Sequence, residues 1–361
     1  MQDKYFEFLV PTRIVFQPGA GAQADEVARR VGISRPFLVA DRGLAQVGLV
    51  ERVAKTLQPA GEYLDVPSDG DLETCERIAG RMKESGADGI VAVGGGSVID
   101  TAKGANIVFT HGGPLADHQG VGVLQGKLAP FVVIPTTAGT GSEVSRIAAL
   151  KDPAQHVKLF FESEYLAADL ALLDPEMTVS MPPKLTAATG MDAMTHAVES
   201  LLASNAAPLT DALAEWAMRR IFEALPVAVR NGQDREARGE MLWASTAAGA
   251  AFSNAGVGVV HACAHALGAL KNVHHGVANS IMLPHGVRFN LQGGSRLPSD
   301  LPGRLADLAR TGGLPSRLRE VGIREEDLPG LAEYATGDGA LITSSREACV
   351  DDILEIFRNA Y

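Results

Sequence analysis

Cysteine is one of the scarcest residues in this chain of 361 residues, which contains only three. Cys75, Cys263 and Cys349 are odd in number, widely spaced and form no CxxC pair. This pattern excludes a disulfide framework and gives no thiolate zinc site. We therefore expect the three thiols to be small buried hydrophobic residues in a reducing cytosol.

Excess positive charge and long apolar runs are also missing. The formal net charge is −11, from 32 Lys and Arg against 43 Asp and Glu, which argues against nucleic acid or an anionic membrane as a partner. No uncharged apolar run approaches the length of a membrane span. The first 16 residues lack the basic flank and apolar block of a signal peptide. We expect a cytoplasmic protein.

The length and an ordinary globular composition, with 46% hydrophobic and 21% charged residues, favour two folded domains. Up to about residue 175, short apolar runs alternate with amphipathic segments, which predicts βαβ units and a parallel sheet. The expected strands are 36–40, 62–66, 89–93 and 131–135, and the expected helices are 43–58, 71–86 and 97–110.

The second half of the chain has a different composition and a different hydrophobic periodicity. Its segments are rich in alanine with helical spacing, convincing strand patterns stop, and Pro175, Pro182 and Pro183 mark the change. We predict an α/β domain over 1–180 and an all-α domain over 181–361. The expected helices are 184–204, 208–230, 235–254, 258–270 and 301–312.

Three consecutive glycines follow the apolar run 89–93. Gly94, Gly95 and Gly96, with Ser97, lead directly into a predicted helix. Glycine lets a phosphate approach the backbone, and the unpaired N–H groups and the helix dipole favour negative charge. A plain tight turn needs fewer glycines, so we interpret the segment as a phosphate-binding loop. It is not the usual GxGxxG fingerprint.

A second loop of small residues, PTTAGTGSEVS (135–145), follows the next expected strand. Its hydroxyl groups can bind phosphate or ribose oxygens, although such residues also commonly form turns. Two such loops at the carboxyl ends of parallel strands favour a ligand site, because ligands of open α/β sheets bind there. The hydroxyl residues are Thr136, Thr137, Thr140 and Ser145.

Asp41 closes the expected strand 36–40. A carboxylate at this place accepts hydrogen bonds from both adenosine-ribose hydroxyls and repels a 2′-phosphate, which favours NAD over NADP. An N-cap for the helix near residue 43 explains Asp41 equally well. Both interpretations stay open.

The second half contains two histidine motifs with helical spacing. Asp192 and His196 lie at i and i+4, and so do His261 and His265, with His274 and His275 further along. One oxygen donor and several imidazoles suit a divalent ion such as Fe²⁺, Zn²⁺, Co²⁺ or Ni²⁺. Burying so many histidines without partners would be costly, so we favour a metal site over histidines of the core. Spacing does not decide which histidines after residue 260 are the ligands.

Four segments in this order carry a family pattern: GGGSVIDTAK, PTTAGTGSEVS, GMDAMTHAVE and HACAHALGALKNVHHGVANSIMLPH. They strongly resemble the iron-containing (group III) alcohol dehydrogenases, and the resemblance extends over nearly the whole chain. It implies an α/β nucleotide-binding domain with a parallel sheet, like that of dehydroquinate synthase, followed by an all-α metal-binding domain.

The resemblance also implies the site residues. The divalent ion, Fe²⁺ first and Zn²⁺ second, would be held by Asp192, His196, His261 and His275, and His265 would be a catalytic histidine near the substrate. NAD would bind at Asp41, Gly94, Gly95, Gly96, Ser97, Asp100, Thr136, Thr137, Thr140, Ser145 and Lys158. His274 stands where the family often has proline.

Three segments depart from the family pattern. The region 291–313 is shorter by about one helix, TSSRE (343–347) replaces an Asn-Pro-Arg-like segment, and VPSDGDLET (66–74) lacks a frequent Asn-Pro pair. None of these departures removes an implied metal ligand. The first bears on the substrate pocket or on contacts in an oligomer.

The function implied is a metal-dependent, NAD(H)-linked alcohol dehydrogenase or aldehyde reductase that acts on a small alcohol or aldehyde, as a homodimer or higher oligomer. A maleylacetate-reductase-like enzyme would need basic residues for a dicarboxylate, and these are sparse near the metal motifs. A dehydroquinate-synthase-type lyase would need a lysine-rich polar site that is not evident. A non-catalytic binder is a further alternative, but all four implied ligands are intact.

Overall fold

The computed structural model describes residues 5–155 and 157–361. Residues 1–4, the start of the segment inspected for a signal peptide, lie outside the described residues. The chain divides into a first unit, Val10–Met181, and a helical unit, Pro182–Tyr361, which also includes residues 5–9. Residues 5–9 were assigned by sequence to the first domain. They join the helical unit because the backbone N–H and carbonyl of Leu9 both bond to the Asn254 side chain.

A six-stranded parallel sheet forms the centre of the first unit, in the order β1-β9-β6-β4-β2-β3. The four expected strands are β2, β3, β4 and β6, whereas β1 and β9 were not predicted. The strands are β1 (Arg13–Phe16), β2 (Pro36–Val39), β3 (Gly61–Tyr63), β4 (Gly89–Gly94), β6 (Phe131–Pro135) and β9 (Leu170–Leu173).

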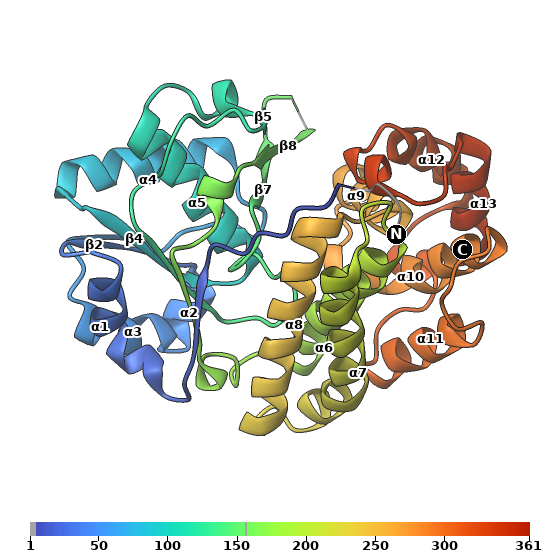
Figure 1. Ribbon diagram of the computed structural model, residues 1–361, viewed down its shortest axis with the longest axis horizontal. Coiled ribbons are helices and arrows are strands. Elements are labelled where there is room, and N and C mark those ends of the chain that lie inside the picture. The colour runs from blue at the N-terminus through green and yellow to red at the C-terminus, as the bar shows by residue number, and fades with distance from the viewer. Residues whose placement is uncertain (1–4, 156) are drawn as a thin grey trace. The chain divides into compact units, whose positions relative to one another are not determined.

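Helices cover both faces of this sheet (Figure 1). Val91 and Val93 pack with the helices α1 and α3, whereas Ile90 and Ala92 pack with α4 and α5. Such alternation follows from the two-residue period of a strand. The central strands are therefore continuous apolar runs. The helices are α1 (Ala24–Arg30), α2 (Arg42–Gln46), α3 (Leu49–Leu57), α4 (Leu72–Ser85) and α5 (Gly96–His111).

The helix expected over 43–58 is two helices, α2 and α3. Gly48 separates them with a φ of 78°, a left-handed conformation that ends the first helix. The first unit also contains a small sheet that was not predicted, in the order β5-β8-β7. Its strands are β5 (Gly120–Val121), β7 (Ile147–Asp152) and β8 (Val157–Glu162).

The helical unit is built around α6, which is buried at every position from Thr186 to Leu202. A helix without a polar face belongs in a core, and α6 packs against α7, α8 and α10. The close approach of α7 requires glycine at 190, where a Cβ would lie 2.4 Å from Leu225 Cδ1. The helices are α6 (Pro183–Leu202), α7 (Pro208–Arg230), α8 (Arg235–Ala255), α9 (Val259–Lys271), α10 (His275–Gln292), α11 (Leu301–Thr311), α12 (Leu328–Thr336) and α13 (Val350–Ala360).

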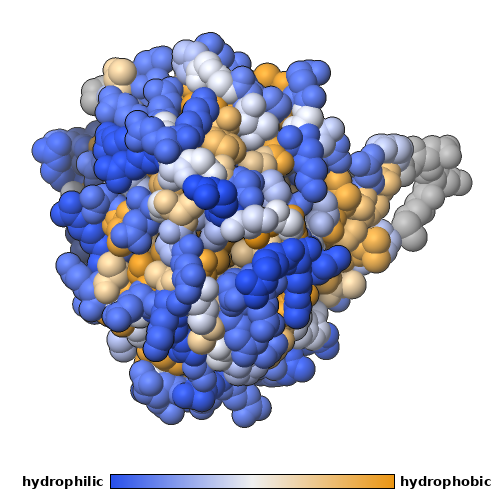
Figure 2. All heavy atoms as spheres, turned by 90° about the vertical axis from the view of Figure 1, so that its left-hand side faces the viewer, coloured by the Kyte–Doolittle hydropathy of each residue, from blue (hydrophilic) through white to orange (hydrophobic). Residues whose placement is uncertain are grey.

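Short 3₁₀ helices connect these elements: η1 (Ala20–Gln23), η2 (Leu115–His118), η3 (Glu164–Leu166), η4 (Pro175–Met177), η5 (Leu318–Val321), η6 (Glu325–Asp327) and η7 (Gly339–Thr343). No single helix of the described residues is long and apolar enough to cross a membrane, although α8 and α9, bent by 102°, meet the length and composition criteria as a pair. Hydrophilic residues cover most of the face in Figure 2.

All three cysteines are free thiols. Cys75 and Cys263 are buried, as expected, but Cys349 is exposed. Cys349 lies just before α13, where its backbone N–H donates to Asp352 Oδ2 at the start of that helix. The expectation that it packs as a core residue is therefore wrong.

Candidate metal centre and cofactor loops

The glycine loop, residues 94–97, joins the end of β4 to the start of α5. Gly95 has a φ of −86°, so glycine is not required there by a left-handed backbone. It is required by space: a Cβ on Gly95 would lie 2.9 Å from Thr137 Oγ1, and one on Gly96 would lie 2.6 Å from Thr140 Cγ2. No side chain of the described residues caps α5, so its first N–H groups are suited to an anionic ligand.

The threonine loop, residues 136–145, follows β6 and packs against the glycine loop. The Thr136 N–H donates to Gly94 O at 3.1 Å, and Thr137 and Thr140 contact Gly95 and Gly96. The structure thus brings together six of the residues assigned to the cofactor, from two adjacent strands: Gly94, Gly95, Gly96, Thr136, Thr137 and Thr140.

Ser145 and Asp100 are placed differently, because each has a side-chain oxygen that accepts a hydrogen bond from within the protein. Ser145 is 2% exposed, and its hydroxyl accepts from Lys103 Nζ at 3.1 Å. Asp100 Oδ2 accepts from the Ala149 N–H at 3.1 Å. Both residues therefore lie behind the loops, as part of their support.

Ser97 and Lys158 both contact the segment 66–74. The Ser97 hydroxyl donates to the Ser68 carbonyl, and Lys158 Nζ lies 3.8 Å from Asp69 Oδ1. The segment that lacks the family's Asn-Pro pair is thus adjacent to the glycine loop.

Asp41 is the N-cap of α2, and its Oδ1 accepts from the Leu44 N–H at 2.9 Å. The helix-cap interpretation is therefore confirmed. It does not compete with ribose binding, because a carboxylate has a second oxygen that can accept further hydrogen bonds.

Three predicted metal ligands converge in the helical unit. Asp192 of α6, His261 of α9 and His275, the first residue of α10, each offer one donor atom, and these atoms lie within 4.8 Å of one another. Asp192 and His261 are buried, whereas the side chain of His275 is 36% exposed. The group is therefore anchored in the core and open to solvent on one side.

His196 lies one turn beyond Asp192 on α6, beside this group but not within it. Its ring stacks on those of His261, at 4.7 Å between centroids, and Phe252, at 4.3 Å. Among the described residues, its buried Nδ1 has no hydrogen-bond partner.

Asn279 of α10 was not predicted, yet its amide lies at the centre of the group. Its Nδ2 is 2.7 Å from Asp192 Oδ1, 3.1 Å from His275 Nε2 and 3.4 Å from His261 Nε2. A carboxylate oxygen and two imidazole nitrogens thus converge on one donor, which is the arrangement that a divalent cation requires. The residues present therefore fit a metal ion.

Glu199, also missed by the sequence analysis, orients His261. Its Oε2 lies 2.5 Å from His261 Nδ1, and its oxygens accept from the N–H groups of Val260 and His261. A carboxylate on Nδ1 fixes the tautomer that leaves Nε2 as the ligand atom, as in many metal sites. Burial raises the pKa of Glu199 to about 7, against the opposing effect of these backbone donors.

The protonation states of the group also suit a cation. Burial acts to raise the pKa of Asp192, but His196, His275 and His261 outweigh it, so this pKa lies below its usual value. Burial, aided by His196, lowers the pKa of His261 well below its ordinary value. An ionised carboxylate and a neutral imidazole are the forms that bind metal.

His265 has a different partner. Its Nδ1 lies 2.9 Å from Asp338 Oδ2, in the turn after α12, and its ring stacks on that of His275 at 5.6 Å. Asp338 was not singled out in the sequence. Because it engages Nδ1, it directs the Nε2 side of His265 away from this carboxylate.

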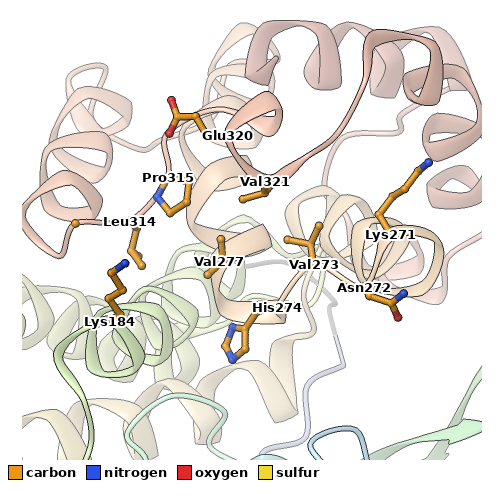
Figure 3. A pocket seen from close by; sticks show the side chains of 11 residues that line it. Lys184, Lys271, Asn272, Val273, His274, Val277, Leu314, Pro315, Glu320 and Val321 are labelled. Atoms are coloured by element: carbon orange, nitrogen blue, oxygen red, sulfur yellow. The ribbon is translucent and has the colours of Figure 1, made fainter.

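His274 is separate from the metal group, which resolves one alternative that the spacing left open. It lines a hollow of about 660 Å³, with Lys184, Val277 and Leu314, and the described lining residues include no member of the metal group (Figure 3). His275 and Asn279 share one face of α10, whereas Val277 points away from it.

The comparisons with known proteins agree with this architecture. The family profile described as iron-containing alcohol dehydrogenase matches residues 11–175, and the C-terminal profile of the same family matches residues 186–361. The chain belongs to the iron-containing alcohol dehydrogenase family. The resemblance inferred from the motifs and the fold class predicted from it are thereby confirmed.

Individual relatives of this alcohol dehydrogenase match along its whole length. The NAD-dependent methanol dehydrogenase of Bacillus methanolicus is 37% identical, over 98% of this chain and 99% of the relative. The 1,3-propanediol dehydrogenase of Klebsiella pneumoniae is 36% identical over all of both chains. A crystal structure of 1,3-propanediol oxidoreductase, 36% identical, superposes with a TM-score of 0.94 over 99% of this chain and 100% of that one.

The alignment with the Klebsiella relative contains gaps in this chain. It extends over 388 positions, whereas this chain has 361 residues. The prediction that residues are missing from the region 291–313 remains a prediction.

Proposed function

We propose that this alcohol dehydrogenase interconverts a small primary alcohol and its aldehyde, with NAD(H) at the glycine and threonine loops and a divalent ion at Asp192, His196, His261 and His275. Fe²⁺ is the first candidate for the ion and Zn²⁺ the second. The observation that carries the proposal is the convergence of Asp192, His261 and His275 within 4.8 Å, with Glu199 on His261.

The chemistry of the two bound groups is simple to state. When bound, the ion would supply Lewis acidity toward the substrate oxygen, and the dinucleotide would supply or accept the hydride. The remaining tasks belong to the chain. Asp192 supplies the negative charge that holds the ion, and Glu199 keeps His261 Nε2 available as a donor.

His265 is the residue proposed to move the substrate's hydroxyl proton. Its side chain is 17% exposed, so it reaches solvent, and Asp338 holds its Nδ1. An imidazole has one ring nitrogen that can donate a proton and one that can accept it, which suits a group that takes up and releases a proton in each turnover.

We propose NAD rather than NADP as the cofactor, because Asp41 places a negative charge at the end of β2. Small unbranched substrates are favoured because the relatives named above act on methanol and 1,3-propanediol. Three free thiols support a cytoplasmic location. The homodimer or higher oligomer implied by the sequence resemblance also remains a proposal, testable by light scattering on the purified chain.

The direct experiment is a matrix of metals, cofactors and substrates. The purified chain would be loaded with Fe²⁺, Zn²⁺ or Co²⁺ and assayed with NAD(H) and NADP(H) on methanol, ethanol, 1,3-propanediol, their aldehydes and maleylacetate. We expect metal-dependent turnover of at least one of these with NAD(H). Turnover of maleylacetate alone, or undiminished turnover after complete chelation, would overturn the proposal.

A further inference from the structure

Lys103 is a fully buried cation in the first unit that neither the metal centre nor the cofactor assignments use. It lies in the middle of α5, 1% exposed, among the largest completely buried side chains of the chain. A buried ammonium group is costly unless hydrogen bonds replace its water shell. The hydrogen-bond acceptors around the Lys103 ammonium group therefore show which part of the structure this charge stabilises.

The ammonium group of Lys103 donates three hydrogen bonds, and all three reach the far end of the threonine loop or the strand that follows it. Nζ donates to Ser145 O at 2.9 Å, to Ser145 Oγ at 3.1 Å and to Ile147 O at 2.8 Å. The three protons of an ammonium group are matched by these three acceptors. Because Ile147 begins β7, one side chain ties the loop and the following strand to α5.

Asp100, three residues earlier on the same face of α5, adds a second tie. Its Oδ2 accepts from the Ala149 N–H in β7. Asp100 and Glu143 also balance the charge of Lys103, since both act to raise its pKa, while burial acts more strongly and lowers it to about 8.

The near end of the same loop is fixed separately, by the bond from the Thr136 N–H to Gly94 O. Between these two ends, Thr137 and Thr140 press against Gly95 and Gly96, where a Cβ would be closer than 3.0 Å. The position of the hydroxyl groups over the start of α5 therefore depends on both ends of the loop.

We propose that Lys103 is a positioning residue for cofactor binding, an internal cation that holds the threonine loop against the start of α5 so that its hydroxyls meet the dinucleotide. Ser145 then acts as an acceptor for Lys103, inside the protein, and does not itself touch the cofactor. This inference rests on one part of the proposed function, namely that the glycine and threonine loops bind NAD(H).

The test compares Lys103→Met, which keeps the length of the side chain but removes the donors, with Lys83→Met, the same change at an exposed position of α4. The dissociation constant for NADH is measured by fluorescence titration of the full chain, alongside the melting temperature and the metal content. We expect Lys103→Met to weaken NADH binding about tenfold, with metal content unchanged, and Lys83→Met to bind as the wild type does.

Lys103→Gln is the second variant, because its amide keeps a hydrogen-bond donor. We expect its affinity for NADH to lie between the affinities of the wild type and Lys103→Met. If either Lys103 variant folds and binds NADH as tightly as the wild type, even at a lower melting temperature, Lys103 is only structural and the inference is wrong. A wild type that binds no NADH would overturn the proposed function itself. Unchanged NADH binding in the variants, with a functional wild type, would overturn this inference alone.

Discussion

Asp192 is the residue on which the candidate metal group depends most, because it supplies the only carboxylate among the three converging donors. Asp192→Asn removes the negative charge but keeps the shape, and His275→Ala removes a ligand at the open side of the group. We expect both variants to lose most bound metal and most activity. Elemental analysis beside turnover tests this, with Asp300→Asn, at an exposed position before α11, as the control.

His261 and His265 share one face of α9 but have different partners, and the partners predict different roles. His261→Ala should lose metal and activity together, because Glu199 orients it as a ligand. His265→Ala should keep its metal and lose about 10²-fold in kcat, the range of a lost general acid or base. Metal content and kcat of both variants decide the matter. Metal loss in the His265 variant, with retention in the His261 variant, would reverse the two roles.

Asp41 caps the helix α2 and also carries the negative charge that is proposed to repel a 2′-phosphate. One substitution can separate these two roles. Asp41→Ser keeps an oxygen that can accept from Leu44 N–H but removes the repulsion of a 2′-phosphate. We expect the NAD to NADP ratio of kcat/KM to fall, with the melting temperature near that of the wild type. An unchanged ratio would leave Asp41 with its capping role alone.

At the scale of elements, the junction of β4 and α5 depends on space between two loops. Gly96→Ala would place a Cβ 2.6 Å from Thr140 Cγ2, so the threonine loop must shift. We expect weaker NADH binding, partly restored in the double variant Gly96→Ala/Thr140→Ser, which removes Thr140 Cγ2 but keeps the hydroxyl. Gly80→Ala, in α4, is the control: apart from its own helix, the new Cβ meets no described atom within 4 Å, so the change should stabilise the chain by about 0.5–1 kcal/mol. Binding is measured by titration and stability by denaturant unfolding.

The sequence predicted those elements whose periodicity is strong. β2, β4 and β6 are apolar runs, and α7 was predicted at its observed bounds. α10 was missed because Gly276 and Pro284 interrupt the pattern, although tertiary packing keeps the helix continuous. β7 and β8 were missed because they form a small, partly exposed sheet with a weak apolar pattern.

The site was predictable where helical spacing or a family motif carried it. Asp192, His261 and His275 converge as the resemblance implied. Glu199 and Asn279 lie inside the same motifs, but a carboxylate or amide on a helix gives no signal until its neighbour in space is known. Asp338 acts on His265 from 73 residues away, so no local spacing relates them.

At the scale of the whole molecule, the chain is already negative, with 43 acidic residues against 32 basic ones. Raising the pH makes the net charge more negative, and the repulsion between like charges should lower the stability of the folded chain. Lys103 works in the opposite direction. Its pKa is lowered from 10.5 to about 8 by burial, so between these values the folded chain has lost the proton that the unfolded chain still binds. Stability rises with pH wherever the unfolded state binds more protons.

The contribution of Lys103 to the pH dependence of stability should therefore appear as a difference in the free energy of unfolding between wild type and Lys103→Met. Below pH 8 the wild type bears the full penalty of a buried charge, and between pH 8 and 10.5 this penalty is relieved, by about 3 kcal/mol. Because the two chains share every other titrating group, we expect the wild type to gain on the variant as pH rises. Urea unfolding at pH 7, 8, 9 and 10 measures the gap. A gap that is constant or moves in favour of Lys103→Met would show that Lys103 keeps its proton in the folded chain throughout this range.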